Sequence, residues 1–522
     1  MHIQTGQPLP KDGHDHGRDR AQDPSKYSLW RSWPLVGTML TLSIAIAPFS
    51  VRANERSPLS TPSEGINSKF GQLPEFSELF TDNQGTLSLS EMPVFSTEAK
   101  YLSIQNRTDS RVEIPSNTNP TQSQNKAQSP VSQLPSPFRG KLTGDWGGFR
   151  STLADYGVTF DLEFTQFYQG LVSGTGSKTF QYGARLDGFV KLDTGKLGIW
   201  EGGGLHTHLE YRFGNLAGSL GNTFFPTNAA MEFPSESPDT LVATSIYLSQ
   251  KFGDRVSLLI GKINALDLLE NDLFFGGWGN RRFMNAVFAA PPSGLVPPVF
   301  FGAIANVKLN PVTLSFWVYD PDDRTQEYLP ENLFSNGVSF SLTTTYATTI
   351  ADRPTTFSLT GIYTTKAGIN FSEISESIRA GLTPPTKEGS YSIGFQFSHL
   401  LHQNPSNPQQ GWGIFLKGAV SDGNPNYVQN SLITGIGGTG LFPERELDSF
   451  GLGYYYYNLS NDLQDTLNPR KERFGNEQGF EMYYSYAVTP WFYFTADLQY
   501  IAPPRNFIND AFIAGLRANI RF

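Results

Sequence analysis

The feature that most constrains this chain is an alternation of apolar and polar residues that recurs from residue 158 to its C-terminal end. In the segment 511–522, Leu516 and Ile520 belong to the apolar set, whereas Arg517 and Arg521 belong to the polar set. Side chains of a β-strand point alternately to its two faces, so this period of two predicts a strand with one apolar and one hydrated face. Such a strand suits a membrane barrel with lipid outside and water inside, although a soluble domain can also end on one.

Three upstream segments, 158–168, 182–193 and 205–213, repeat the alternation and carry charged residues on their polar faces. A β-sandwich core does not demand charged faces on strand after strand, whereas a water-filled barrel does. Closure into a barrel also removes the unpaired strand edges that lipid cannot tolerate. Further strands are expected near 239–252, 255–263, 298–308, 312–320, 337–350, 355–366, 389–398, 411–421, 427–436, 447–457, 479–488, 491–501 and 511–522. The sequence therefore predicts an all-β fold, a transmembrane antiparallel β-barrel of about 16 strands.

The connections between these segments alternate between short and long. Tight turns are expected at 253–254, 310–311, 351–354 and 489–490, and long loops near 214–238, 264–297, 321–336, 367–388 and 458–478. Short turns at one end and long loops at the other are typical of outer-membrane barrels. Around 422–446 the order is reversed, because a short connection precedes a long one.

The start of the chain predicts export. The apolar run 34–49 follows Lys26 and Arg31, and its 16 residues are few for a membrane-spanning helix but suit the core of a secretory signal. We expect residues 1–53 to be a signal peptide with a long n-region, cleaved after Ala53. A short membrane anchor is the alternative.

Two further segments precede the barrel. Residues 54–137 are rich in Ser, Pro, Asn, Gln and Thr, so they predict a disordered polar linker in the periplasm. Residues 138–157 predict a short periplasmic helix that Asp145 caps and Gly157 ends. The barrel is expected to occupy 158–522.

Composition excludes several classes of protein. The absence of cysteine excludes disulfides, thiolate metal sites and a lipoprotein anchor. A mean hydropathy of −0.31 argues against a helical membrane protein with several spans. The net charge of −9 argues against a nucleic-acid partner and, less strongly, against an anion-selective pore.

From Lys141 onward the chain resembles the OprB-type carbohydrate-selective porins of bacterial outer membranes. The resemblance rests on a series of short motifs in a fixed order over 141–522. They are LTGDWGGFR at 142–150, GARLD at 183–187, the GK-N–LD pattern at 261–267, FMN at 283–285 followed by APP at 290–292, FGLGYY at 450–455 and VTPWFYFTADLQYI at 488–501.

The resemblance implies a sixteen-stranded barrel that passes sugars by diffusion, with extracellular loops folded inward to narrow the pore. The chain departs from many family members in carrying the linker at 54–137. Some cyanobacterial relatives carry a surface-layer homology domain there, and no such domain is recognisable here. Relatives of that kind can pass inorganic ions, so a general or ion-permeable pore stays open as an alternative.

Passive transport of sugars requires aromatic faces for pyranose rings and polar groups that replace hydroxyl hydration, with binding weak enough for release. Candidate pore-lining residues lie on the polar faces of two predicted strands. They are Arg185, Asp187 and Lys191 on the first, and His206, His208, Glu210 and Arg212 on the second. The alternative is that these side chains only keep the lumen hydrated and hold the strands together through ion pairs.

The loop at 264–297 is the expected constriction. It carries Trp278 among glycines, followed by Arg281 and Arg282, which would offer a stacking surface beside hydrogen-bond donors. An extracellular cap without solute contact is the alternative.

Other chemistries find little support. His206 and His208 share a face, but a metal site needs a third ligand at the same depth, and the sequence identifies none. The G-x-G-x-x-G pattern at Gly435, Gly437 and Gly440 lacks the following helix of a nucleotide site. No Ser-His-Asp arrangement is evident among the four histidines of the mature chain. We therefore expect no catalytic site, no bound metal and no cofactor.

The expected location is the bacterial outer membrane, with small sugars or other small hydrophilic solutes and membrane lipids as partners. In bacterial barrels a terminal aromatic such as Phe522, on an alternating last strand, resembles the signal read by the barrel-assembly machinery. A homotrimer and a monomer are both compatible with the sequence. An envelope-tethering role through the linker is a third functional class.

Overall fold

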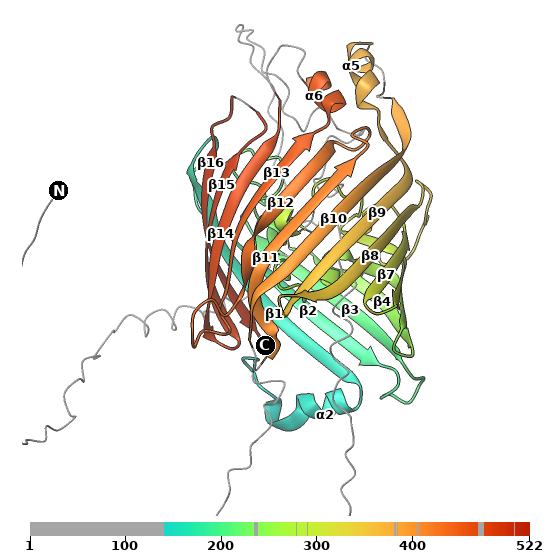
Figure 1. Ribbon diagram of the computed structural model, residues 1–522, viewed down its shortest axis with the longest axis vertical. Coiled ribbons are helices and arrows are strands. Elements are labelled where there is room, and N and C mark those ends of the chain that lie inside the picture. The colour runs from blue at the N-terminus through green and yellow to red at the C-terminus, as the bar shows by residue number, and fades with distance from the viewer. Residues whose placement is uncertain are drawn as a thin grey trace, which may run out of the picture. The chain divides into compact units, whose positions relative to one another are not determined.

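The computed structural model describes residues 140–522 except 234–238, 278, 290, 381–382, 384, 405–406, 468–473 and 506. Sixteen antiparallel strands form one closed barrel in which each strand pairs with its sequence neighbours and β1 pairs with β16 (Figure 1). The strands are β1 Val158–Ser173, β2 Gln181–Asp193, β3 Gly203–Gly214, β4 Leu241–Phe252, β5 Val256–Asn264, β6 Val299–Lys308, β7 Val312–Tyr319, β8 Ser339–Ile350, β9 Arg353–Ile369, β10 Thr386–Asn404, β11 Asn407–Ser421, β12 Val428–Thr439, β13 Ser449–Leu459, β14 Glu477–Thr489, β15 Phe492–Ala502 and β16 Ala511–Arg521. The predicted barrel is confirmed, and each observed strand overlaps a predicted one.

The two faces of the wall follow the period of two in the sequence. On β16, Leu516 is 42% exposed on the outside, whereas Arg517 is 1% exposed on the inside. The register that closes the barrel sets Phe167 opposite Arg517 and Glu163 opposite Arg521. Closure pairs every strand on both sides, so no edge is left to lipid.

The two ends of the barrel differ, as predicted. Connections of two or three residues join β4 to β5, β6 to β7, β8 to β9 and β14 to β15 at one end, which we call the short-turn end. The opposite, long-loop end carries α5 (Phe371–Ala380) and α6 (Asn461–Leu467) (Figure 1). The predicted reversal is also present, since residues 422–427 form a short connection at the long-loop end and 440–448 a longer one at the short-turn end.

A short helix lies below the short-turn end. The 3-10 turn η4 (Trp146–Gly148) leads into α2 (Phe149–Asp155), and the Asp145 carboxylate accepts a hydrogen bond from the backbone N–H of Ser151 (2.8 Å) (Figure 1). Gly157 follows the helix with a φ of 90°, which a glycine adopts without strain. The predicted short helix before the barrel is confirmed, although Gly148 and not Asp145 is the N-cap residue of α2, and its periplasmic location stays a prediction. No helix within the described ranges is long and apolar enough to cross a membrane.

The predicted signal peptide (1–53) and polar linker (54–137) lie outside the described residues. They therefore stay predictions.

The guanidinium of Arg150 fastens α2 to the barrel. Its Nη2 donates to the carbonyl oxygen of Phe160 (2.7 Å) and to Asp161 Oδ1 (3.2 Å), and its Cζ lies 4.8 Å from the Phe160 ring centroid.

Arg150→Ala is expected to weaken docking of the helix by about 1.5–3 kcal/mol, because a buried charge-assisted hydrogen bond is lost. Hydrogen exchange of the α2 amides checks this, with the exposed Lys178→Ala as control. Unchanged protection in Arg150→Ala would contradict the anchoring role.

Candidate pore constriction

The connection between β5 and β6, residues 265–298, folds into the barrel and is called the lumen loop here. It contains η5 (Ala265–Leu269) and α4 (Ala286–Ala289). The backbone N–H groups of Met284 and Asn285 donate to the carboxylate of Glu481 on β14, the second over 2.9 Å. Arg517 on β16 donates to the carbonyl oxygens of Gly279 and Arg282. Since β14 lies across the barrel from β5 and β6 in the strand order, the loop crosses the lumen.

An apolar core packs between the lumen loop and the inner wall. The rings of Phe283 and Phe288 stack with centroids 4.3 Å apart. Tyr483 meets Phe283 edge-on at 5.0 Å, and Tyr455 meets Phe288 edge-on at 5.8 Å. All four side chains are buried. The loop is therefore held by burial of aromatic surface as well as by hydrogen bonds.

In the second connection, residues 215–240 between β3 and β4, the stretch 215–233 also folds inward and includes α3 (Ala229–Glu232). Asn228 Nδ2 donates to Gln169 Oε1 on β1 (3.1 Å), and the N–H of Phe224 donates to Glu477 Oε2 on β14 (2.7 Å). Phe225 packs edge-on against Tyr457 at 4.9 Å. The sequence predicted a long loop here without indicating that it narrows the lumen.

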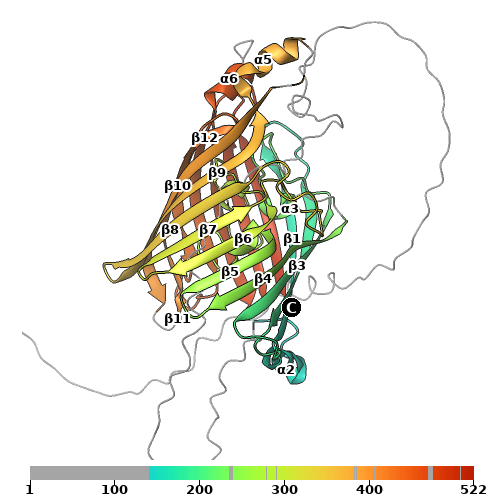
Figure 2. The same ribbon diagram turned by 90° about the vertical axis from the view of Figure 1, so that its right-hand side faces the viewer.

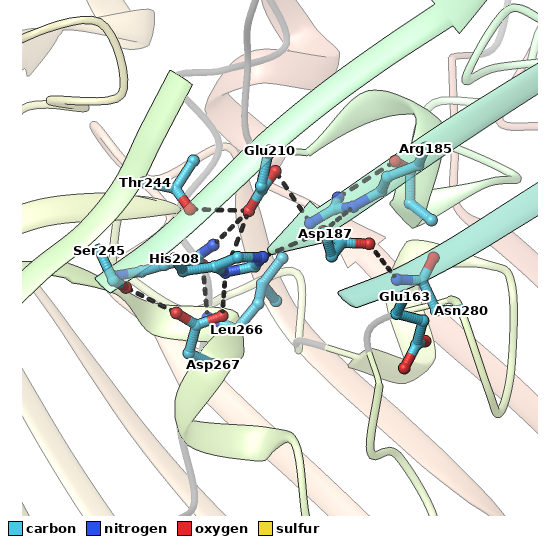
Figure 3. A network of polar contacts seen from close by, with 12 residues as sticks. Glu163, Arg185, Asp187, His208, Glu210, Thr244, Ser245, Leu266, Asp267 and Asn280 are labelled. Carbon is cyan, nitrogen blue, oxygen red and sulfur yellow. Dashed lines mark hydrogen bonds and ion pairs between the residues drawn. The ribbon is translucent and has the colours of Figure 1, made fainter. Parts of the chain in front are cut away.

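Four of the predicted pore-lining residues form one buried network of ion pairs (Figure 3). Arg185 Nε donates to Asp187 Oδ1 (2.7 Å), and Arg185 Nη2 lies 2.8 Å from Glu210 Oε2. His208 Nε2 lies 3.0 Å from Asp187 Oδ1, and its Nδ1 lies 2.8 Å from Oδ1 of Asp267 in the lumen loop. The network thus joins β2 and β3 to η5.

The same network holds both inward loops. Asn280 of the lumen loop donates to Asp187 Oδ2 (2.9 Å), as Figure 3 shows. Arg185 Nη1 donates to the carbonyl oxygen of Phe233 (2.7 Å), and Arg212 Nη1 donates to that of Met231 (2.6 Å). The structure therefore places these polar side chains as anchors of the loops.

The arrangement has one feature in common with metal sites. Ligand atoms of Asp187, His208 and Glu210 lie within 4.8 Å of one another. However, both ring nitrogens of His208 already contact carboxylates, and Arg185 contacts both Asp187 and Glu210. A metal ion here would bind the carboxylates of Asp187 and Glu210, but the guanidinium of Arg185 already neutralises their negative charge. We therefore interpret the cluster as an ion-pair network.

Between the lumen loop and the short-turn end lies a cavity of about 1140 Å³. Five of the predicted residues line it, namely Lys191, His206, His208, Arg281 and Arg282, and His208 also belongs to the buried network. Arg185, Asp187, Glu210 and Arg212 lie outside its lining. The predicted set is thus divided between the cavity wall and the buried network behind it.

Two carboxylates hold Arg281 at the cavity wall. Its Nη2 lies 2.5 Å from Glu163 Oε2 and 3.5 Å from Glu270 Oε1. Burial opposes the charge of Arg281, but the carboxylates of Glu163 and Glu270 hold its pKa above the ordinary value. Arg281 therefore stays charged at the cavity wall.

Aromatic rings lie beside these charges. Arg521 Cζ lies 4.4 Å from the Tyr493 ring centroid, and both residues line the cavity. His206 stacks on Tyr247 at 4.7 Å while its Nε2 lies 2.9 Å from Ser249 Oγ. The predicted stacking residue Trp278 lies outside the described residues.

Several cavity residues were absent from the predicted set. Arg521 belongs to the polar face of the last strand, so strand alternation already predicted that it faces inward, although it was not among the candidate pore-lining residues. Tyr493 follows a tight turn, and no local signal distinguishes it from the many other tyrosines. Glu270 lies in the lumen loop, whose path is set by contacts distant in sequence.

A family model described as carbohydrate-selective porin, OprB family, matches residues 177–522. A comparison with curated protein sequences returned no match. Among solved structures, the high-pH structure of Pseudomonas putida OprB is 18% identical, has a TM-score of 0.65, and is matched over 74% of this chain and 99% of that one. The low-pH structure of the same protein is 18% identical over 73% of this chain and 98% of that one, with a TM-score of 0.46.

Outer-membrane OmpT of Vibrio cholerae is 12% identical over 70% of this chain and 97% of that one, with a TM-score of 0.42. At these identities the structural matches show the fold alone, and the first carries that conclusion. The family model covers well over half of the chain and adds the family. The chain therefore belongs to the OprB family of carbohydrate-selective porins, β-barrels of the bacterial outer membrane.

Proposed function

We propose that small hydrophilic solutes, sugars foremost, diffuse passively through the cavity and past the lumen loop. The observation that carries this proposal is the cavity wall, which combines aromatic rings with fixed charges of both signs. Tyr247 and Tyr493 offer apolar faces, whereas Arg281, Arg282 and Glu270 offer charged hydrogen-bonding groups.

This wall suits a sugar because a pyranose has an apolar ring face and a rim of hydroxyl groups. The Arg281 guanidinium can donate to hydroxyl oxygens while Glu163 keeps it in place. A sugar in this cavity would contact only a few protein groups at a time, so its binding stays weak enough for release. The family and the fold point to a transport channel, and diffusion requires no reacting group.

An inorganic-ion pore is the second candidate. Lys191, Arg282 and Arg521 line the cavity together with carboxylates such as Asp193, Glu201 and Asp272, so its wall offers charged groups to small ions of either sign. Liposome swelling with mono- and oligosaccharides, amino acids and sulfate separates the two candidates. Faster entry of sugars supports sugar preference, preferential entry of sulfate supports the inorganic-ion pore, and equal entry of all solutes indicates a general pore. No conductance in planar bilayers would instead support an envelope-tethering role.

Arg281→Ala is expected to weaken binding of sugar in the channel. Loss of one charge-assisted hydrogen bond, about 1.4 kcal/mol, corresponds to roughly tenfold lower affinity. Sugar-induced interruption of single-channel current measures this affinity. Lys178→Ala, which removes the same charge from an exposed loop, is the matched control. Unchanged sugar interruption in Arg281→Ala would remove Arg281 from the solute path.

A further inference from the structure

The connection between β7 and β8, residues 320–338, lies against the outside of the barrel, and we call it the outer strap. The evidence is the burial of wall residues that face outward. Lys262 follows the outward Ile260 by two positions on β5, yet it is 1% exposed, whereas Ile260 is 52% exposed. On β6, Phe301 and Val299 alternate with the inward Phe300 and are also buried. Only a segment on the outer surface can cover these positions.

Hydrogen bonds fasten the outer strap to the wall. Lys262 Nζ donates to the carbonyl oxygens of Thr325 (2.7 Å) and Glu327 (2.6 Å). The N–H of Arg324 donates to the carbonyl oxygen of Val299 (2.8 Å), and that of Asp320 donates to Phe301 (2.9 Å). Tyr328 Oη donates to the carbonyl oxygen of Leu241 on β4 (3.2 Å). The strap therefore spans the upper ends of β4, β5 and β6, which Figure 2 shows side by side.

Several charges of the outer strap are paired, most of them within the strap. Arg324 contacts Asp320 Oδ2 (2.9 Å) and Glu327 Oε1 (2.6 Å). The same Asp320 Oδ2 also accepts a hydrogen bond from the N–H of Phe334 (2.7 Å). Asp322 pairs with Lys366 of β9 (2.9 Å). The strap is thus a folded element with an ionic interior.

Its outer surface carries several large apolar side chains. Tyr328, Leu329, Leu333 and Phe334 are all exposed, Leu329 to 67%. Across 328–336, all of which the structure describes, Glu331 is the single charged residue. A loop surrounded by water would be expected to turn its charges outward and its large apolar side chains inward. The outer strap instead exposes four large apolar side chains and buries Asp320 and Arg324.

The strands beneath the strap are short. β5 has 9 residues and β7 has 8, compared with 17 in β9 and 19 in β10. At about 3.3 Å per residue and a tilt of about 40°, eight or nine residues span roughly 20 Å, which is less than the apolar band of about 25 Å around such barrels. β9 and β10 extend further toward the end that carries α5 (Figure 2). An apolar covering above β5–β7 would supply the missing height.

We propose that the outer strap is a lipid-contacting element, whose residues 328–334 lie in the outer leaflet at the boundary between acyl chains and headgroups. The surface is continuous with the lipid-facing wall below it, where Ile246, Leu248 and Ile260 are exposed. The lipid contact completes the apolar band where the barrel wall is lowest. It is independent of which solute the pore conducts.

Site-directed spin labelling tests this directly, because the chain has no cysteine of its own. Leu329→Cys and Phe334→Cys carry the label in the full chain, reconstituted in phospholipid bilayers. Ile260→Cys on the wall is the lipid reference, and Ser177→Cys in the exposed β1–β2 connection is the water reference. Each labelled protein is first shown to conduct like the parent, so that misfolded variants are excluded.

The measured quantity is the ratio of the label's accessibility to oxygen and to a water-soluble nickel chelate. We expect the ratio at positions 329 and 334 to approach that of Ile260 and to exceed that of Ser177 several-fold. A ratio equal to that of Ser177 would show that the strap faces water and overturn the proposal. Low accessibility to both reagents with dipolar broadening would show a second copy of the chain on this surface, which would also overturn it.

Discussion

Phe288→Ala is expected to release the lumen loop and to produce a wider, less selective pore. Phe288 is fully buried between Phe283 and Tyr455, and truncation of such a ring costs about 3–5 kcal/mol. The barrel should stay closed, because its strand pairing does not involve this side chain. Single-channel conductance and the largest oligosaccharide that enters liposomes are both expected to increase.

Phe316→Ala provides the matched control, because this phenylalanine is 46% exposed on the outer wall of β7. Its removal should leave conductance and size exclusion unchanged. If Phe288→Ala kept the conductance and the size limit of the parent, the lumen loop would not be the constriction.

Arg185→Met is expected to lower the free energy of unfolding by about 3–5 kcal/mol, because it leaves buried carboxylates without their guanidinium partner. Arg185 is fully buried and contacts Asp187 and Glu210, and it also holds the carbonyl oxygens of Ala230 and Phe233. Guanidinium-induced unfolding in detergent micelles, followed by tryptophan fluorescence, measures the change.

Lys191→Met on the same strand is the control. It makes the same change of side chain at an exposed position, where substitutions usually alter stability by about 0.5 kcal/mol or less. Equal stability of the two variants would show that the ion-pair network does not hold the fold.

The strands were predictable to within a few residues because their signal is local. The alternation in 205–213 appears in the structure as β3, and the polar face found in the sequence is the inner face, with His208 and Glu210 buried. The short turns at 310–311 and 351–352 were likewise visible as residues that end strands. The outer strap was not predictable, since its position depends on Lys262 in a distant strand.

The candidate site was predicted only in part. Alternation correctly indicates which side chains of β2 and β3 point inward, but it does not separate Lys191 at the cavity wall from Arg185 behind it. That distinction is made by the two inward loops, which cover some inward residues and leave others open. The loops in turn are held by contacts such as Arg281 with Glu163, 118 positions apart, and Asn285 with Gln499, 214 positions apart.

The sequence by itself determined the architecture, because a period of two and the alternation of short and long connections are properties of neighbouring residues. A family resemblance visible in its motifs agreed with that architecture. Only the tertiary structure decided which polar residues line the pore, which ones anchor the loops, and which wall residues the outer strap covers. These assignments depend on the paths of long connections, and such paths are fixed by packing and ion pairs between residues that no local pattern links.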